Sequence, residues 1–257
     1  MAIGHGYLAV GGHRAELTVR HLNTSWLVRT SVGGSINNSL TIFSHRGEKR
    51  LLVSNNDQTI KVYSLPDFRK LDVLDFPTAV NHAAVSPDGT KLIAVGDSSQ
   101  IFLYNIRGND FEKMSVLSGT GDSGFSCSWN QSSEKFATAS QDGYVLAWDL
   151  RQTKSMARFS THQSSSKGAA RCVKFSPSGS IDLLLYSEHV SYINVVDART
   201  FNSRQIVRVA PTHQDQNISG VCFSPSSKSI FVGLESSIHK YEVDTTTRRC
   251  FPEGDIN

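Results

Sequence analysis

Short apolar runs separated by polar turns recur along the chain at a nearly constant interval. The apolar residues that open four of these intervals lie 44, 46 and 48 positions apart, at Val85, Trp129, Phe175 and Phe223. A weaker copy opens at Phe43. Within each interval the runs are four to seven residues long, several alternate with a period of two, and clusters of Ser, Gly, Asp and Asn separate them. This pattern predicts a repeat built from β-strands.

A period of about 41 to 48 residues with three or four strands is typical of propeller blades, which bury both faces by stacking around an axis. We therefore predict an all-β fold, a β-propeller of about six blades that forms a single domain over residues 1–257. The expected blades span residues 7–32 (partial), 36–75, 79–118, 123–160, 168–210 and 217–251.

One repeat carries a recognisable sequence. Residues 140–149, Ser-Gln-Asp-Gly-Tyr-Val-Leu-Ala-Trp-Asp, resemble the signature of WD-repeat propellers, and the likeness extends over about residues 36–250. In that family a Ser, a turn Asp, a Trp and an upstream His form a hydrogen-bonded chain that braces each blade. No repeat here holds the complete set. The resemblance assigns the bracing role to seven residues: Ser140, Asp142, Trp148, His162, His213, Asp57 and Tyr63.

A narrower resemblance covers some twenty residues. The segment 182–189, continuing to 196–201, looks like one typical of a fungal WD-repeat group that includes a substrate receptor of the GID ubiquitin ligase. This likeness implies a function in binding other proteins, with ubiquitin-ligase subunits among the expected partners.

The two ends of the chain differ in their strand count. Tyr7–Gly11, Glu16–Leu22 and Trp26–Val32 give the first blade three strands, and residues 1–6 are too short and Gly-rich to supply an innermost strand. The last repeat has four, with Thr246–Phe251 as the fourth. We predict either a truncated seven-blade ring or a six-position ring closed imperfectly between its first and last blades.

Composition and charge exclude several classes of protein. The chain carries 26 basic and 23 acidic residues, a balance that disfavours nucleic acid as a partner, and it holds no apolar run long enough to cross a membrane. The first residues show no secretory signal, and the four cysteines have no metal-binding spacing. A GxGxxG match at 119–124 precedes a strand rather than the helix that a dinucleotide site needs. We expect no catalytic residues, cofactor or metal, and a cytoplasmic or nuclear location.

Partner contacts are expected at the rim, because propellers present strand beginnings at the channel mouth. Counting four residues back from each apolar anchor gives one position per blade: Ser39, Asn81, Phe125, Arg171 and Ser219. A Phe and an Arg on adjacent blades have the composition of a binding hot spot. The alternative is that Phe125 packs between blades and Arg171 pairs with an acid such as Asp122. We predict a non-catalytic interaction scaffold, with a ubiquitin-ligase substrate receptor as its finer form. The remaining alternatives are an enzyme using the channel and a propeller that binds phosphoinositide or nucleic acid.

Overall fold

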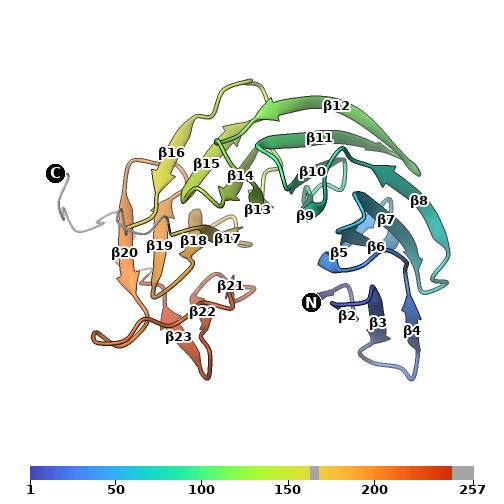
Figure 1. Ribbon diagram of the computed structural model, residues 1–257, viewed down its shortest axis with the longest axis horizontal. Coiled ribbons are helices and arrows are strands. Elements are labelled where there is room, and N and C mark those ends of the chain that lie inside the picture. The colour runs from blue at the N-terminus through green and yellow to red at the C-terminus, as the bar shows by residue number, and fades with distance from the viewer. Residues whose placement is uncertain (163–167, 245–257) are drawn as a thin grey trace. The chain divides into compact units, whose positions relative to one another are not determined.

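The computed structural model describes residues 1–162 and 168–244, and within these ranges every regular element is a β-strand. The strands form six antiparallel sheets in the order of the sequence (Figure 1), which we call blades 1 to 6. The predicted fold class, an all-β propeller of about six blades, is confirmed.

The first three blades contain four strands each. Blade 1 holds β1 (Ala2–Gly4), β2 (Tyr7–Gly11), β3 (Glu16–His21) and β4 (Leu27–Ser31). Blade 2 holds β5 (Asn37–His45), β6 (Glu48–Asn55), β7 (Thr59–Leu65) and β8 (Lys70–Asp75). Blade 3 holds β9 (Val80–Val85), β10 (Lys91–Gly96), β11 (Gln100–Arg107) and β12 (Asp110–Ser118).

The last three blades follow the same plan. Blade 4 holds β13 (Gly124–Trp129), β14 (Lys135–Ser140), β15 (Tyr144–Asp149) and β16 (Ala157–Ser160). Blade 5 holds β17 (Ala170–Phe175), β18 (Leu183–Glu188), β19 (Tyr192–Asp197) and β20 (Arg204–Arg208). Blade 6 holds β21 (Gly220–Phe223), β22 (Ser229–Gly233) and β23 (Ile238–Glu242). The fourth strand expected at Thr246–Phe251 lies outside the described residues.

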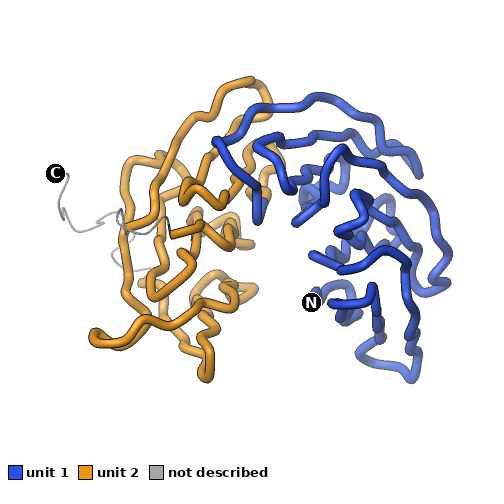
Figure 2. The backbone as a smooth tube through the Cα atoms, in the orientation of Figure 1, with its two compact units in different colours: residues 1–127 blue, residues 128–257 orange. Residues whose placement is uncertain are grey.

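The chain divides into two compact units, residues 1–127 and 128–257, which are coloured separately in Figure 2. The first unit contains blades 1 to 3, and the second contains β14 to β23. The boundary falls within β13.

The prediction that blade 1 lacks its innermost strand is wrong. The three residues of β1 pair with β2 in the register Ala2↔Ala9, Ile3↔Leu8 and Gly4↔Tyr7. The connection is a tight two-residue turn, His5–Gly6, whose φ angles of 50° and 83° are both positive. Turns of this kind match the twist of a hairpin and favour Gly, so the Gly-rich sequence is the hairpin signal that the sequence interpretation missed.

The middle strands of blades 2 to 5 are buried on both faces over most of their length. In β6, Leu51 and Val53 pack in a cluster shared with blade 1, while Leu52 packs in one shared with blade 3, and all three side chains have no exposed surface. In the second unit, all six residues of β18 are buried. Two of the outermost strands, β4 and β16, instead alternate exposed and half-buried positions. Burying one Leu stabilises the fold by about 1.5–3 kcal/mol, so stacking of the blades accounts for the continuous apolar runs.

Candidate functional site

In each of blades 2, 3 and 5, a β-bulge occurs at the beginning of the innermost strand. The register between β5 and β6 passes from Asn37↔Asn55 to Ser39↔Ser54 and leaves Asn38 unpaired in the ladder. In the same way β9 leaves Asn81 between Val80 and His82, and β17 leaves Arg171 between Ala170 and Cys172. Bulges turn one side chain away from the regular alternation and occur often beside functional sites. Asn38, Asn81 and Arg171, which we call the bulge residues, therefore hold equivalent positions.

Two of the five sequence-predicted rim positions, Asn81 and Arg171, coincide with bulge residues. In blade 2 the equivalent residue is Asn38, whereas the count from Phe43 gave Ser39. The strand register explains the difference. Ile42 lies four residues after the bulged Asn38, just as Val85 lies four residues after the bulged Asn81, so the equivalent starting point of the count is Ile42. Among the described residues the buried Ser39 hydroxyl has no hydrogen-bond partner.

The bulge residues of the first unit tie neighbouring blades together. Asn38 Nδ2 donates to the Val80 carbonyl oxygen at 3.0 Å, and Asn81 Nδ2 donates to the Gly124 carbonyl oxygen at 3.1 Å. Asn81 Nδ2 also donates to Asp97 Oδ1 at 2.8 Å. These amides thus have a structural role, and each one positions the start of the next innermost strand.

Arg171 differs from the two asparagines, because its side chain is exposed. Its Nε donates to His189 Nδ1 at 3.3 Å, a contact that requires the His189 proton on Nε2. Ala170, the residue before it in β17, has no exposed surface, so its packing holds this part of the strand in place. Ser219 is exposed just before β21, and its N–H donates to the Gly233 carbonyl oxygen at 2.9 Å.

Phe125 is half-buried in β13 and belongs to the first unit, whereas Arg171 belongs to the second. Joint action of these two residues stays a prediction.

Close to Arg171 in the sequence, blade 5 holds a network that fixes the rim. Glu188 is 2% exposed and accepts hydrogen bonds from the His162 N–H at 2.6 Å and from Asn194 Nδ2 at 3.0 Å. Arg208 donates to the Tyr192 hydroxyl at 2.9 Å and to Asp215 at 3.0 Å.

The Ser191 hydroxyl also donates to Asp215, and this bond, together with Arg208, lowers the pKa of the Asp215 carboxyl against the opposing effect of burial. The loop after β20 is held to blade 5 by these contacts. Sequence reasoning missed this network, because each partner is an ordinary polar turn residue and only the fold brings them together.

The residues assigned to bracing occupy varied surroundings. Trp148 is 1% exposed, and its indole N–H donates to Thr138 Oγ1 at 3.2 Å. Ser140 is buried, and Asp142 Oδ1 accepts a hydrogen bond from the Tyr144 N–H. The resemblance did not identify Thr138, which stands two residues before Ser140 on β14.

In blade 2 the turn acid makes a different contact from the one the family chain implies. Asp57 Oδ2 accepts from Lys61 Nζ at 2.6 Å, and Tyr63 stacks on Phe68 with ring centroids 4.7 Å apart. Burial raises the pKa of Asp57, but hydrogen bonds from Lys61 and Thr59 outweigh it, and the pKa lies below its usual value.

The two histidines also differ. The His162 ring lies 4.8 Å from the Tyr192 ring, centroid to centroid, while His213 is exposed in the loop after β20.

The Tyr186 phenol yields a testable pH dependence. It has no exposed surface, and burial raises its pKa to about 12, although Arg204 beside the hydroxyl acts in the opposite direction. The pKa of Tyr186 in the folded chain exceeds the unfolded value of about 10. The contribution of the neutral phenol to the unfolding free energy is therefore complete below pH 10 and is lost as the pH rises through 12. We expect the unfolding free energy to fall by about 2 to 3 kcal/mol more between pH 10 and 12 in the native chain than in Tyr186→Phe. Urea unfolding at stepped pH measures this, and parallel curves for the two proteins would contradict it.

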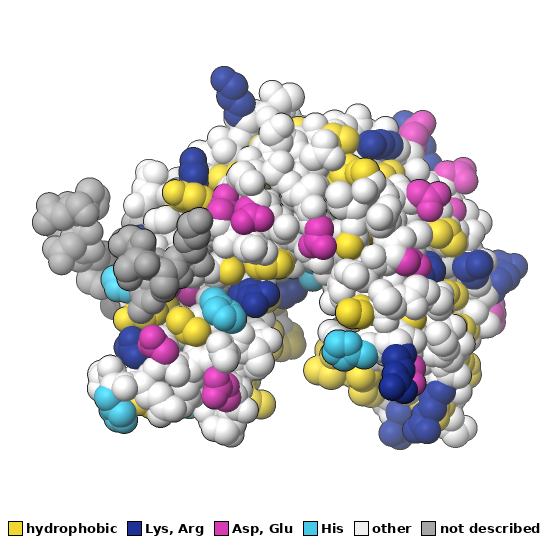
Figure 3. Space-filling view, in the orientation of Figure 1, with side chains coloured by type: hydrophobic (Ala, Val, Ile, Leu, Met, Phe, Trp, Pro, Cys, Tyr) yellow, Lys and Arg dark blue, Asp and Glu magenta, His cyan; other side chains and the backbone are white. Residues whose placement is uncertain are grey.

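The described residues contain no group of three or more His, Cys, Asp or Glu side chains placed to hold a metal ion. In the same part of the chain, no helix is long and apolar enough to span a membrane. On the face shown in Figure 3, acidic and basic side chains lie interspersed over the second unit.

Comparison with known proteins places two family models on the chain. The model described as "WD domain, G-beta repeat" matches residues 111–149, and an uncharacterised protein domain, DUF2415, matches residues 168–208. The first match covers the signature segment of blade 4, and the second covers most of blade 5, including Arg171 and the narrower resemblance at 182–201.

Three relatives are similar over different lengths. An uncharacterised protein of Schizosaccharomyces pombe is 33% identical over 96% of this chain and 74% of its own length. An uncharacterised protein of Saccharomyces cerevisiae is 25% identical over 72% of this chain and 30% of its own length. WD repeat-containing protein 1 of Xenopus tropicalis is 32% identical over 52% of this chain and 23% of its own length.

Proposed function

The chain belongs to the WD-repeat family and to the family of the Schizosaccharomyces pombe protein, and on this premise we propose that it is a non-catalytic scaffold that binds other proteins. One observation carries the proposal: a β-bulge on a fixed strand presents the exposed Arg171, next to His189, at the beginning of blade 5. Arginine is enriched among the residues that dominate protein–protein binding energy, because its planar guanidinium binds carboxylates and carbonyls with several hydrogen bonds.

The finer form of the proposal is a substrate receptor of a ubiquitin ligase. It is supported by the likeness of residues 182–201 to the fungal group that includes a GID receptor. In this form the chain works in the cytoplasm or the nucleus, where thiols stay reduced, in keeping with the thiols of Cys172 and Cys222.

Affinity purification with mass spectrometry tests both forms. The native chain is compared with Arg171→Ala and with Arg107→Ala, a control that removes another exposed arginine, one in the first unit. We expect Arg171→Ala to bind the proteins captured by the native chain and by Arg107→Ala about thirtyfold more weakly, with an unchanged melting temperature, because a central arginine contributes about 2 kcal/mol to binding.

The possible outcomes test different parts of the proposal. Capture by Arg171→Ala equal to that by the native chain would remove blade 5 as the binding site. Partners without ubiquitin-ligase subunits would remove the receptor form and keep the scaffold. Phe125→Ala, measured separately, tells whether that residue binds partners or only packs in the first unit.

A further inference from the structure

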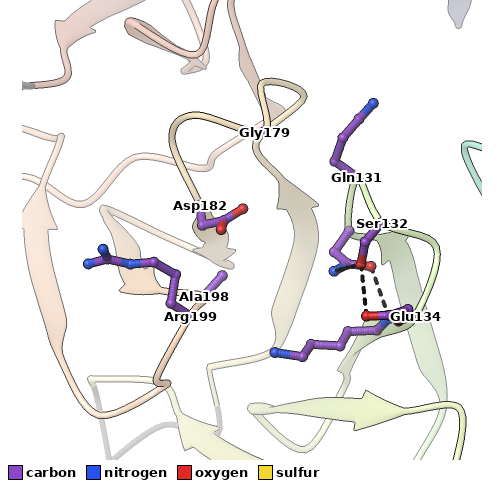
Figure 4. Close-up of a pocket in the computed structure, with 9 residues that line it drawn as sticks. Gln131, Ser132, Glu134, Gly179, Asp182, Ala198 and Arg199 are labelled. Atoms are coloured by element: carbon purple, nitrogen blue, oxygen red, sulfur yellow. Dashed lines mark hydrogen bonds between the residues drawn. The ribbon is translucent and has the colours of Figure 1, made fainter.

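We draw no further inference here: the strongest candidate, the polar cavity of about 440 Å³ that the turns of blades 4 and 5 form beside Glu134 and Asp182 (Figure 4), carries nothing, because these two surface carboxylates already interact electrostatically with Arg151 and Arg199 and no second observation points to a ligand.

Discussion

Replacing Gly34 by alanine is expected to destabilise the first unit by about 3 kcal/mol or more, because the loop between blades 1 and 2 has no room for a methyl group there. Gly34 has a φ of +82°, and a Cβ at this position would meet Asn55 Oδ1 and lie 2.5 Å from Asp57 Oδ2. Both oxygens are already in use. Asn55 Oδ1 accepts from the Asp57 N–H at 2.9 Å, and Asp57 Oδ2 accepts from Lys61 at 2.6 Å.

The surrounding contacts leave this network little freedom to move aside. Lys61 Nζ also donates to the Gly33 carbonyl oxygen at 3.1 Å, and Asn55 Nδ2 donates to the same oxygen at 3.0 Å. Any shift that makes room for the methyl group therefore breaks a hydrogen bond of a buried polar group, which costs about 1–3 kcal/mol for each group left unsatisfied.

Gly33→Ala is the matched control. Its φ of +80° is nearly the same, but nothing lies within 4 Å of the added Cβ, so only the backbone strain of about 1–2 kcal/mol remains. Urea unfolding of the two variants beside the native chain measures the difference. Equal losses would show that the loop adapts and that the contacts of Asn55 and Asp57 do not constrain it.

Thr138→Val and Thr78→Val are expected to change stability in opposite directions. The Thr138 hydroxyl accepts the indole N–H of Trp148, which is 1% exposed, so its removal leaves a buried donor unpaired at a cost of about 1–3 kcal/mol. The Thr78 hydroxyl is buried, and no partner exists for it among the described residues. Its replacement by a methyl group is expected to stabilise the chain by up to about 1 kcal/mol.

Each variant is the control for the other, because both replace a threonine hydroxyl by a methyl group, at positions that differ in hydrogen bonding. Thermal and urea unfolding, followed by tryptophan fluorescence for Thr138→Val, provide the measurement. Destabilisation by Thr78→Val would mean that this hydroxyl is bonded, and an unchanged Thr138→Val would mean that the indole finds another acceptor.

Much of the architecture could be predicted, because the apolar residues that open each repeat recur at a regular spacing in the sequence. The interval between Val85, Trp129 and Phe175 corresponds to one blade, so the number and order of sheets followed from spacing alone. The strand β1 was missed because three residues are too few to show alternation, although Gly6 marks the turn that folds them back.

The candidate site was only partly predictable. The count that found Asn81 and Arg171 missed Asn38 by one position, because a bulge shifts the register and the sequence does not show which apolar residue follows it by four. The cavity between blades 4 and 5 was not foreseen. Glu134 and Asp182, which line it, lie 48 positions apart and look like ordinary turn residues, and only the stacking of two blades brings them to one pocket.

At a β-bulge, the choice of side chain does not affect the pairing of the sheet. A residue in a regular ladder position must suit its neighbours on the sheet, so replacing it disturbs packing. A bulged residue pairs with nothing in the ladder, and blades with the same backbone hold Asn at position 81 and Arg at position 171. The bulge therefore lets the ladder stay the same while the side chain differs in role: Asn38 and Asn81 position the neighbouring strand, and Arg171 presents an exposed guanidinium.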